Sequence, residues 1–147
     1  VIQCCLGWQD AETHQFLIGK IFYQPGFGID GTSRRVEFDE AKFSLHDLEE
    51  PMQFIFSYLY DGGGGWEAQL TLEQIIADGA EHQHAVVNAG ERNGPPEDVG
   101  DIHRFQALLE RFEQDGSEVM QLDDGQSFDP NDCDLSAINH QLATTSD

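Results

Sequence analysis

The pattern of hydrophobic and polar positions predicts a pair of strands in the middle of the chain. Residues 53–60 (QFIFSYLY) alternate so that four aromatic side chains share one side of an extended segment. These are Phe54, Phe56, Tyr58 and Tyr60. Residues 66–75 (WEAQLTLEQI) alternate in the same way, with Trp66 at the first inward position. We expect the two segments to form an antiparallel hairpin.

Two other segments also have the composition of strands. Residues 15–23 (QFLIGKIFY) are rich in branched and aromatic side chains and predict one strand. Residues 85–90 (AVVNAG) predict a shorter one. Ser44 and Asp47 have the spacing of a capping box, which indicates a single helical turn after Ser44.

Apolar residues repeating every three or four positions predict two helices in the C-terminal part of the chain. The first is expected at residues 102–114, with Asp101 as its N-cap and Gly116 at its end. Its apolar stripe consists of Ile102, Phe105, Leu108, Leu109 and Phe112. The second helix begins near Asp134 and is expected to bury Leu135, Ile138 and Leu142. At the other end, residues 1–8 have the pattern of the end of a helix.

Strands and helices therefore occur in blocks, which favours an α+β fold over an alternating α/β sheet. The predicted architecture is a single-domain roll over residues 1–147: a mainly antiparallel sheet with a long hairpin, covered by helices. A chain of 147 residues is long enough for one domain with its own hydrophobic core.

The net charge of −21 is the unusual feature of the composition. Phosphate groups of nucleic acids and anionic membranes would be repelled by it, so direct nucleic-acid binding is disfavoured. An unknown protein or small-molecule partner of cationic character fits the charge, although a solvated acidic surface is the simpler interpretation. The three cysteines lack metal-ligand spacing, and no apolar stretch reaches the roughly 18 residues of a membrane span. We expect a cytoplasmic protein with reduced thiols and no cofactor.

The run of four glycines at residues 62–65 does not have the features of a phosphate-binding loop. Such loops open a helix and usually carry a Lys, whereas this run precedes a strand and is flanked by Asp61 and Glu67. The two carboxylates are candidates for a cation site or acid/base pair, although solvated charges at a hairpin end are commoner. Four aromatic residues are candidates for an aromatic pocket, but aromatic residues at strand spacing are more often core, and we favour that interpretation. They are Trp8, Tyr58, Tyr60 and Trp66.

A second group of candidate residues surrounds the Pro-Pro-Glu-Asp sequence at residues 95–98. Glu97, Asp98 and Asp101 lie close together in the sequence, and His103 follows them. His14 could approach this group from the N-terminal part of the chain. Carboxylates with imidazoles are a common metal-ligand set. The structural alternative, which we favour, is that Asp101 caps the helix, Glu97 and Asp98 favour its N-terminal end, and His103 is exposed.

Taken in order, five segments resemble the plasmid pRiA4b ORF-3-like family found on plasmids and insertion elements. They are LGWQDAETHQF, SLHDL, YLYDGGGGWEA, GPPEDVGD and FDPNDCDLSAINHQL. The resemblance runs almost end to end, and it implies an α+β domain with a further strand and helix before Val1. Where the family usually reads Tyr-Asp-Phe-Gly-Asp-x-Trp-Glu-His, this chain has Gly64 and Ala68 in place of the second Asp and the His.

The resemblance supplies no biochemical activity, because members of the family are largely uncharacterised. The loss of an Asp and a His from the glycine segment favours a non-catalytic binding or interaction module with an acidic surface and no metal. The alternative is a metal-dependent hydrolase with its site between the Pro-Pro-Glu-Asp loop and the glycine hairpin.

Overall fold

The computed structural model describes residues 1–9, 13–26, 36–47, 54–61, 65–76 and 84–145. Contacts between backbone positions divide the chain into two compact units. The sheet unit is Glu12–Asp78, and the helical unit is Val1–Ala11 together with Gly79–Asp147. Each unit is considered by itself below.

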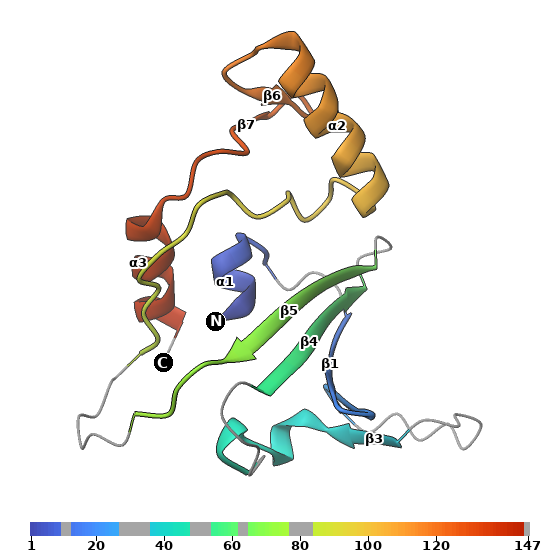
Figure 1. Cartoon of the computed structure of the whole chain (residues 1–147), viewed down its shortest axis with the longest axis vertical. Coiled ribbons are helices and arrows are strands. Elements are labelled where there is room, and N and C mark those ends of the chain that lie inside the picture. Colours follow the sequence, from blue (N-terminus) through green and yellow to red (C-terminus); the bar gives the residue numbers. More distant parts are fainter. Residues whose placement is uncertain (10–12, 27–35, 48–53, 62–64, 77–83, 146–147) are drawn as a thin grey trace. The chain divides into compact units, whose positions relative to one another are not determined.

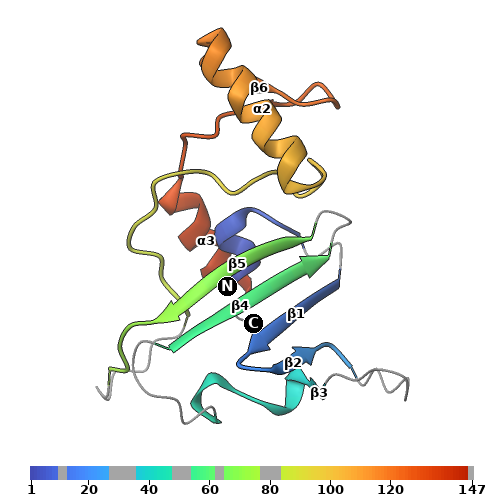
Figure 2. The same cartoon turned by 45° about the vertical axis from the view of Figure 1, so that its right-hand side comes forward.

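The sheet unit contains a five-stranded sheet in the order β3-β2-β1-β4-β5 (Figures 1 and 2). The strands are β1 (Thr13–Ile18), β2 (Ile21–Gln24), β3 (Val36–Asp39), β4 (Phe54–Asp61) and β5 (Trp66–Leu72). All neighbouring strands are antiparallel except β2 and β3, which are parallel. Two short 3-10 turns follow β3, η1 (Glu40–Lys42) and η2 (Leu45–Asp47).

The predicted central hairpin is confirmed. β4 and β5 are antiparallel, with Tyr60 opposite Trp66 and Phe54 opposite Leu72, so β5 ends three residues before the predicted boundary. Burial follows the expected alternation, because Tyr60 is 1% exposed whereas Ile55, on the other face of β4, is 55% exposed. The glycine loop itself, residues 62–64, lies outside the described residues; Gly65 has a φ of 61°, which glycine adopts at little cost.

Two strand predictions are wrong. Residues 15–23 form two strands instead of one, because the chain turns at Gly19, whose φ is 62°, and Ile18 then faces Ile21 across a hairpin. Residues 85–90 form no strand. The amide side chain of Asn139 accepts a hydrogen bond from the backbone N–H of Val87 and donates one to its carbonyl oxygen, at 2.7 and 2.9 Å. It therefore occupies the positions that a neighbouring strand would use.

The short strand β3 was not predicted, although Val36 and Phe38 alternate with polar neighbours in the manner of a strand. The turn expected after Ser44 is present as η2. The carboxylate of Asp47 accepts hydrogen bonds from the backbone N–H and the hydroxyl of Ser44, both at 2.7 Å. This is the return half of a capping box, in which the acidic side chain reaches back to the first residue.

The described residues of the helical unit form three helices and a small hairpin. They are α1 (Ile2–Leu6), α2 (Ile102–Asp115), β6 (Met120–Gln121), β7 (Ser127–Phe128) and α3 (Leu135–Thr145). The predicted helix ends are confirmed: Asp101 accepts a hydrogen bond from the N–H of Arg104 at 2.8 Å, and Gly116 is left-handed with a φ of 62°. Asp134 caps α3 through the N–H of Ala137 at 2.9 Å.

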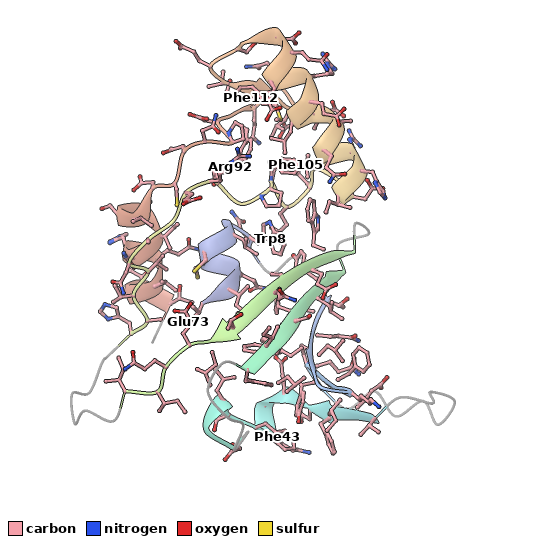
Figure 3. All side chains as sticks on the ribbon, in the orientation of Figure 1. Trp8, Phe43, Glu73, Arg92, Phe105 and Phe112 are labelled. Carbon is pink, nitrogen blue, oxygen red and sulfur yellow. The ribbon has the colours of Figure 1, made fainter. Side chains whose placement is uncertain are left out.

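The apolar stripe of α2 is half-buried, except for Ile102, which is 45% exposed. Phe105 and Phe112 lie on the same side of the helix (Figure 3), and the ring of Phe105 meets that of Phe128 edge-on at 6.3 Å. Within the helical unit α2 thus packs against the β6–β7 hairpin. Leu142 of α3 is buried, as predicted.

The mixed five-stranded sheet and the three helices make this an α+β fold, as predicted. None of the helices in the described residues combines the length and the apolar character needed to cross a membrane.

Candidate functional site

The polar pair His14 and Glu40 lies within the sheet unit, on the aromatic face of the sheet. His14 lies on β1, opposite Tyr60 of β4, and Glu40 is the first residue of η1. The imidazole Nε2 and the carboxylate Oε1 are 3.1 Å apart, and the two side chains are 15% and 27% exposed. Twenty-six positions of sequence separate the two residues, so the fold and not local sequence creates the pair.

The surroundings of the pair are apolar rings. His14 lies against Tyr58 with ring centroids 5.5 Å apart, and it meets Phe16 edge-on at 6.1 Å. The second carboxylate oxygen of Glu40, Oε2, is shielded from solvent, and none of the described residues hydrogen-bonds to it. A solvent-shielded carboxylate oxygen without a donor is costly, so it marks a place where a further positive or hydrogen-bonding group would be stabilising.

The turn that carries Glu40 is fixed by its own cap. Asp39 accepts a hydrogen bond from the N–H of Ala41 at 3.2 Å, and Lys42 contacts the same carboxylate at 3.7 Å. Phe43, at the end of the turn, packs against Tyr23 and Phe38 with ring centroids 5.2 and 5.3 Å away (Figure 3). The backbone of Glu40 is therefore held between a cap and an aromatic cluster.

The other predicted site residues of the sheet unit lie around the β4–β5 hairpin. Tyr60 is buried and stacks on Tyr58 at 6.4 Å, which supports the core interpretation. Trp66 is half-buried opposite Tyr60. Asp61 ends β4 opposite Thr13, and Glu67 is exposed, where its carboxylate accepts a hydrogen bond from the Ser57 hydroxyl at 2.6 Å.

The predicted residues of the helical unit serve mainly to fix the Pro-Pro-Glu-Asp loop. Glu97 accepts a hydrogen bond from the backbone N–H of Gln9 at 2.9 Å, and Asp101 is the N-cap of α2. Asp98 and His103 are exposed. No three His, Cys, Asp or Glu side chains within the described ranges are close enough to share a metal ion.

The same loop is tied to the end of α1 at two more points. The indole N–H of Trp8 donates to the carbonyl oxygen of Pro95 at 2.8 Å, and Trp8 lies beside this segment in Figure 3. Gly94 passes so close to α1 that a Cβ there would be 2.4 Å from the carbonyl oxygen of Leu6. Only glycine fits at that distance, which explains why a glycine precedes the two prolines.

Glu40 is the residue of this site that the candidates from the sequence lack, whereas Tyr58 was considered for an aromatic pocket. Tyr58 was assigned to the core face, and nothing in the segment FDEAK distinguishes Glu40 from its acidic neighbours. The one available signal was the Asp39 cap, which predicts a turn starting at Glu40. That signal does not place the turn over the sheet face.

The three cysteines carry free thiols. Burial raises the pKa of the Cys5 thiol, so less of it is thiolate at neutral pH than in an exposed cysteine. Cys133 lies against Gly90, where an added Cβ would be 2.4 Å from its Sγ. These observations favour packing over reactivity.

The sheet, the helices and the contacts made by the motif residues define an α+β protein. The model of the plasmid pRiA4b ORF-3-like proteins matches residues 1–137, and the chain belongs to this family.

Two relatives are similar over much of the chain, and neither has a described activity. An uncharacterized protein of Sinorhizobium fredii, y4hQ, is 30% identical over 119 residues, which is 75% of this chain and 55% of that protein. This chain therefore spans about half the length of that relative. A protein of unknown function from Methanosarcina mazei, MM3350, has a crystal structure that matches 92% of this chain and 77% of its own, with a TM-score of 0.68 and 25% identity.

Proposed function

We propose that this chain is a non-catalytic binding module whose acidic surface engages a cationic partner. The observation that carries the proposal is the charge: with 28 acidic and 7 basic residues, most carboxylates would lack a basic partner even if every Lys and Arg formed a separate pair. A surface of this kind attracts cations and steers a positively charged protein toward it.

The acidic surface is best defined on α2 and the β6–β7 hairpin, where exposed carboxylates are dense. They are Asp98, Asp101, Glu110, Glu113, Asp115, Glu118, Asp123 and Asp124. One of these, Asp123, is paired with Arg104. We name this set the α2 acidic surface, and we place the cationic partner there.

The assignment as non-catalytic is supported by the structural hydrogen bonds that the candidate carboxylates make. Glu97 holds the backbone at Gln9, Asp101 caps α2, and Glu67 binds the Ser57 hydroxyl at an exposed position. Carboxylates held in this way are structural groups. In the glycine segment, Gly64 and Ala68 replace the Asp and the His that the family usually has there.

We also propose that the protein functions in the cytoplasm, in association with plasmids or insertion elements. The family's description, which names a plasmid, and the three free thiols support this proposal. Direct contact with nucleic acid is not part of it, because the charge has the wrong sign.

Titration with a fluorescent oligolysine peptide tests the binding proposal. We expect affinity that falls steeply with salt, and we expect Glu110→Gln with Glu113→Gln to weaken it several-fold. Glu67→Gln with Glu73→Gln, which removes the same charge from the sheet unit, is the matched control and should change the affinity less. Equal effects of the two pairs would show that the peptide responds to total charge and not to the α2 acidic surface.

A metal-dependent hydrolase is the second candidate function. The observation that favours it is the His14–Glu40 pair, since an imidazole beside a carboxylate is a common arrangement in metal and proton chemistry. The site expected from the sequence lies at other residues, those of the Pro-Pro-Glu-Asp loop and the glycine hairpin. Hydrolysis of an activated phosphodiester that requires Zn²⁺ or Mn²⁺ and is lost in both His14→Ala and Glu40→Gln would favour this candidate over the binding module.

A further inference from the structure

The contact between His14 and Glu40 has two possible explanations. Nε2 of His14 and Oε1 of Glu40 are 3.1 Å apart, so either an imidazole N–H donates a hydrogen bond to the carboxylate or a metal ion lies between the two atoms. The two explanations differ in what they do for the rest of the carboxylate.

A hydrogen bond from the imidazole engages one carboxylate oxygen of Glu40 and leaves the other oxygen without a partner. Glu40 Oε2 is solvent-shielded, and no residue of the described chain hydrogen-bonds to it, so a hydrogen bond between His14 and Oε1 does not account for it. A metal ion chelated by both oxygens of the carboxylate and by Nε2 would satisfy all three atoms at once. The unpartnered oxygen therefore distinguishes the two cases and favours the metal.

We propose that His14 and Glu40 bind a divalent transition-metal ion, with Zn²⁺ as the best match to one imidazole and one carboxylate. The donors are Nε2 of His14 and both oxygens of Glu40. Two protein side chains leave at least one coordination position for water or an outside ligand, so the site is an open one. The proposal rests on the geometry of this pair and is independent of the proposed binding function.

The surroundings suit this role. Tyr58 and Phe16 contact the imidazole and lower the polarity around it, which strengthens the attraction between a cation and its ligands. The capped turn holds Glu40 in place from the other side. Both ligands project from the same face of the sheet unit, so no other part of the chain is needed.

Histidine-detected NMR on the 147-residue chain tests the proposal, because it reports each imidazole separately. Addition of Zn²⁺ is expected to shift the ring Nε2 resonance of His14 with one-to-one stoichiometry. Glu40→Gln should weaken this binding by at least about tenfold. Glu37→Gln is the matched control. Glu37 lies on β3, but the alternation of side chains along the strand places it on the opposite face of the sheet, so this change should leave the affinity for Zn²⁺ unchanged.

Several results would overturn the proposal. One is a His14 resonance that does not move at Zn²⁺ concentrations that shift the resonance of the exposed His103. Another is equal affinity of Glu40→Gln and Glu37→Gln at the His14 resonance. The spectrum of the unmodified chain decides the question even if a variant fails to fold.

Discussion

Two regions of the chain order their backbones by different means. In the sheet unit, neighbouring strands pair residue by residue, as in the seven aligned positions of β4 and β5. The extended segment, residues 84–100, contains neither helix nor strand, although every residue of it is described. Its backbone groups pair with side chains instead: Asn139 with Val87, and Trp8 with Pro95.

The extended segment has two further hydrogen bonds to distant residues at its centre. The backbone N–H of Asn93 donates to the carbonyl oxygen of Pro130 at 3.2 Å, and its side-chain amide donates to that of Asp129 at 3.4 Å. Hydrogen bonds in a sheet form a ladder in which each bond supports the next, whereas these are separate contacts from distant residues. Each hydrogen bond to the extended segment is therefore individually important for its backbone, whereas no single bond of the sheet ladder is.

The largest effect is expected from the sheet core. Tyr60→Ala removes a ring that is 1% exposed and stacks on Tyr58, so the free energy of unfolding should fall by about 4 kcal/mol. Ile55→Ala, on the other face of β4, should cost less than about 1 kcal/mol, because Ile55 is 55% exposed. Urea denaturation of both variants measures the difference. Similar losses would mean that the sheet does not have one buried and one exposed face.

The next effect is expected where α3 meets the extended segment. Asn139→Ala removes both hydrogen bonds to Val87 and leaves two half-buried backbone groups without their partner, at a cost of about 2 kcal/mol. Hydrogen exchange at the Val87 amide should accelerate along with this loss. Gln141→Ala, at an exposed position of the same helix, is the control and should change neither quantity. Unchanged exchange at Val87 in Asn139→Ala would contradict the pairing.

This contrast also explains which elements were predictable from the sequence. The β4–β5 hairpin and α2 follow from hydrophobic periodicity, which is a repeated signal, and both are confirmed together with the Asp101 and Gly116 ends of α2. The strand expected at residues 85–90 is wrong because Asn139, some 52 positions away, takes the place of a neighbouring strand. No local pattern reports a contact at that separation.

The candidate site shows the same limit. His14 was named from the sequence because imidazoles are chemically versatile, but its partner Glu40 was not, since a carboxylate in FDEAK resembles the other acidic residues of the chain. The hairpin at Gly19 was missed for a different reason: the apolar residues on both sides of the turn form an unbroken pattern, and only the glycine marks the turn. A single glycine is a weak signal compared with the six apolar residues of the same segment.

A smaller effect is expected at the loop end of the extended segment. Trp8→Phe keeps an aromatic ring in a position that is 3% exposed but removes the N–H that binds the Pro95 carbonyl, at a cost of about 1.5 kcal/mol. The loss should be local, so exchange of the Glu97 and Val99 amides should accelerate while amides of β4 keep their protection. If the β4 amides accelerate to the same extent, Trp8 supports the whole chain and not the loop.

The smallest effect comes from one pair of matched changes, one in each region. Glu67 accepts a hydrogen bond from the Ser57 hydroxyl at 2.6 Å, and Glu97 accepts one from the Gln9 N–H at 2.9 Å, so the two bonds have similar geometry. Glu67→Gln should change the free energy of unfolding by less than about 0.5 kcal/mol, because Glu67 is exposed and the β4–β5 ladder holds both strands without it. Glu97→Gln should cost about 1 kcal/mol, because the loop has few other bonds to replace it. Thermal and urea unfolding in low and moderate salt measure both variants. If Glu67→Gln lowers the free energy of unfolding as much as Glu97→Gln does, the hydrogen bonds of the sheet are no more redundant than the separate bonds of the extended segment, and the distinction is wrong.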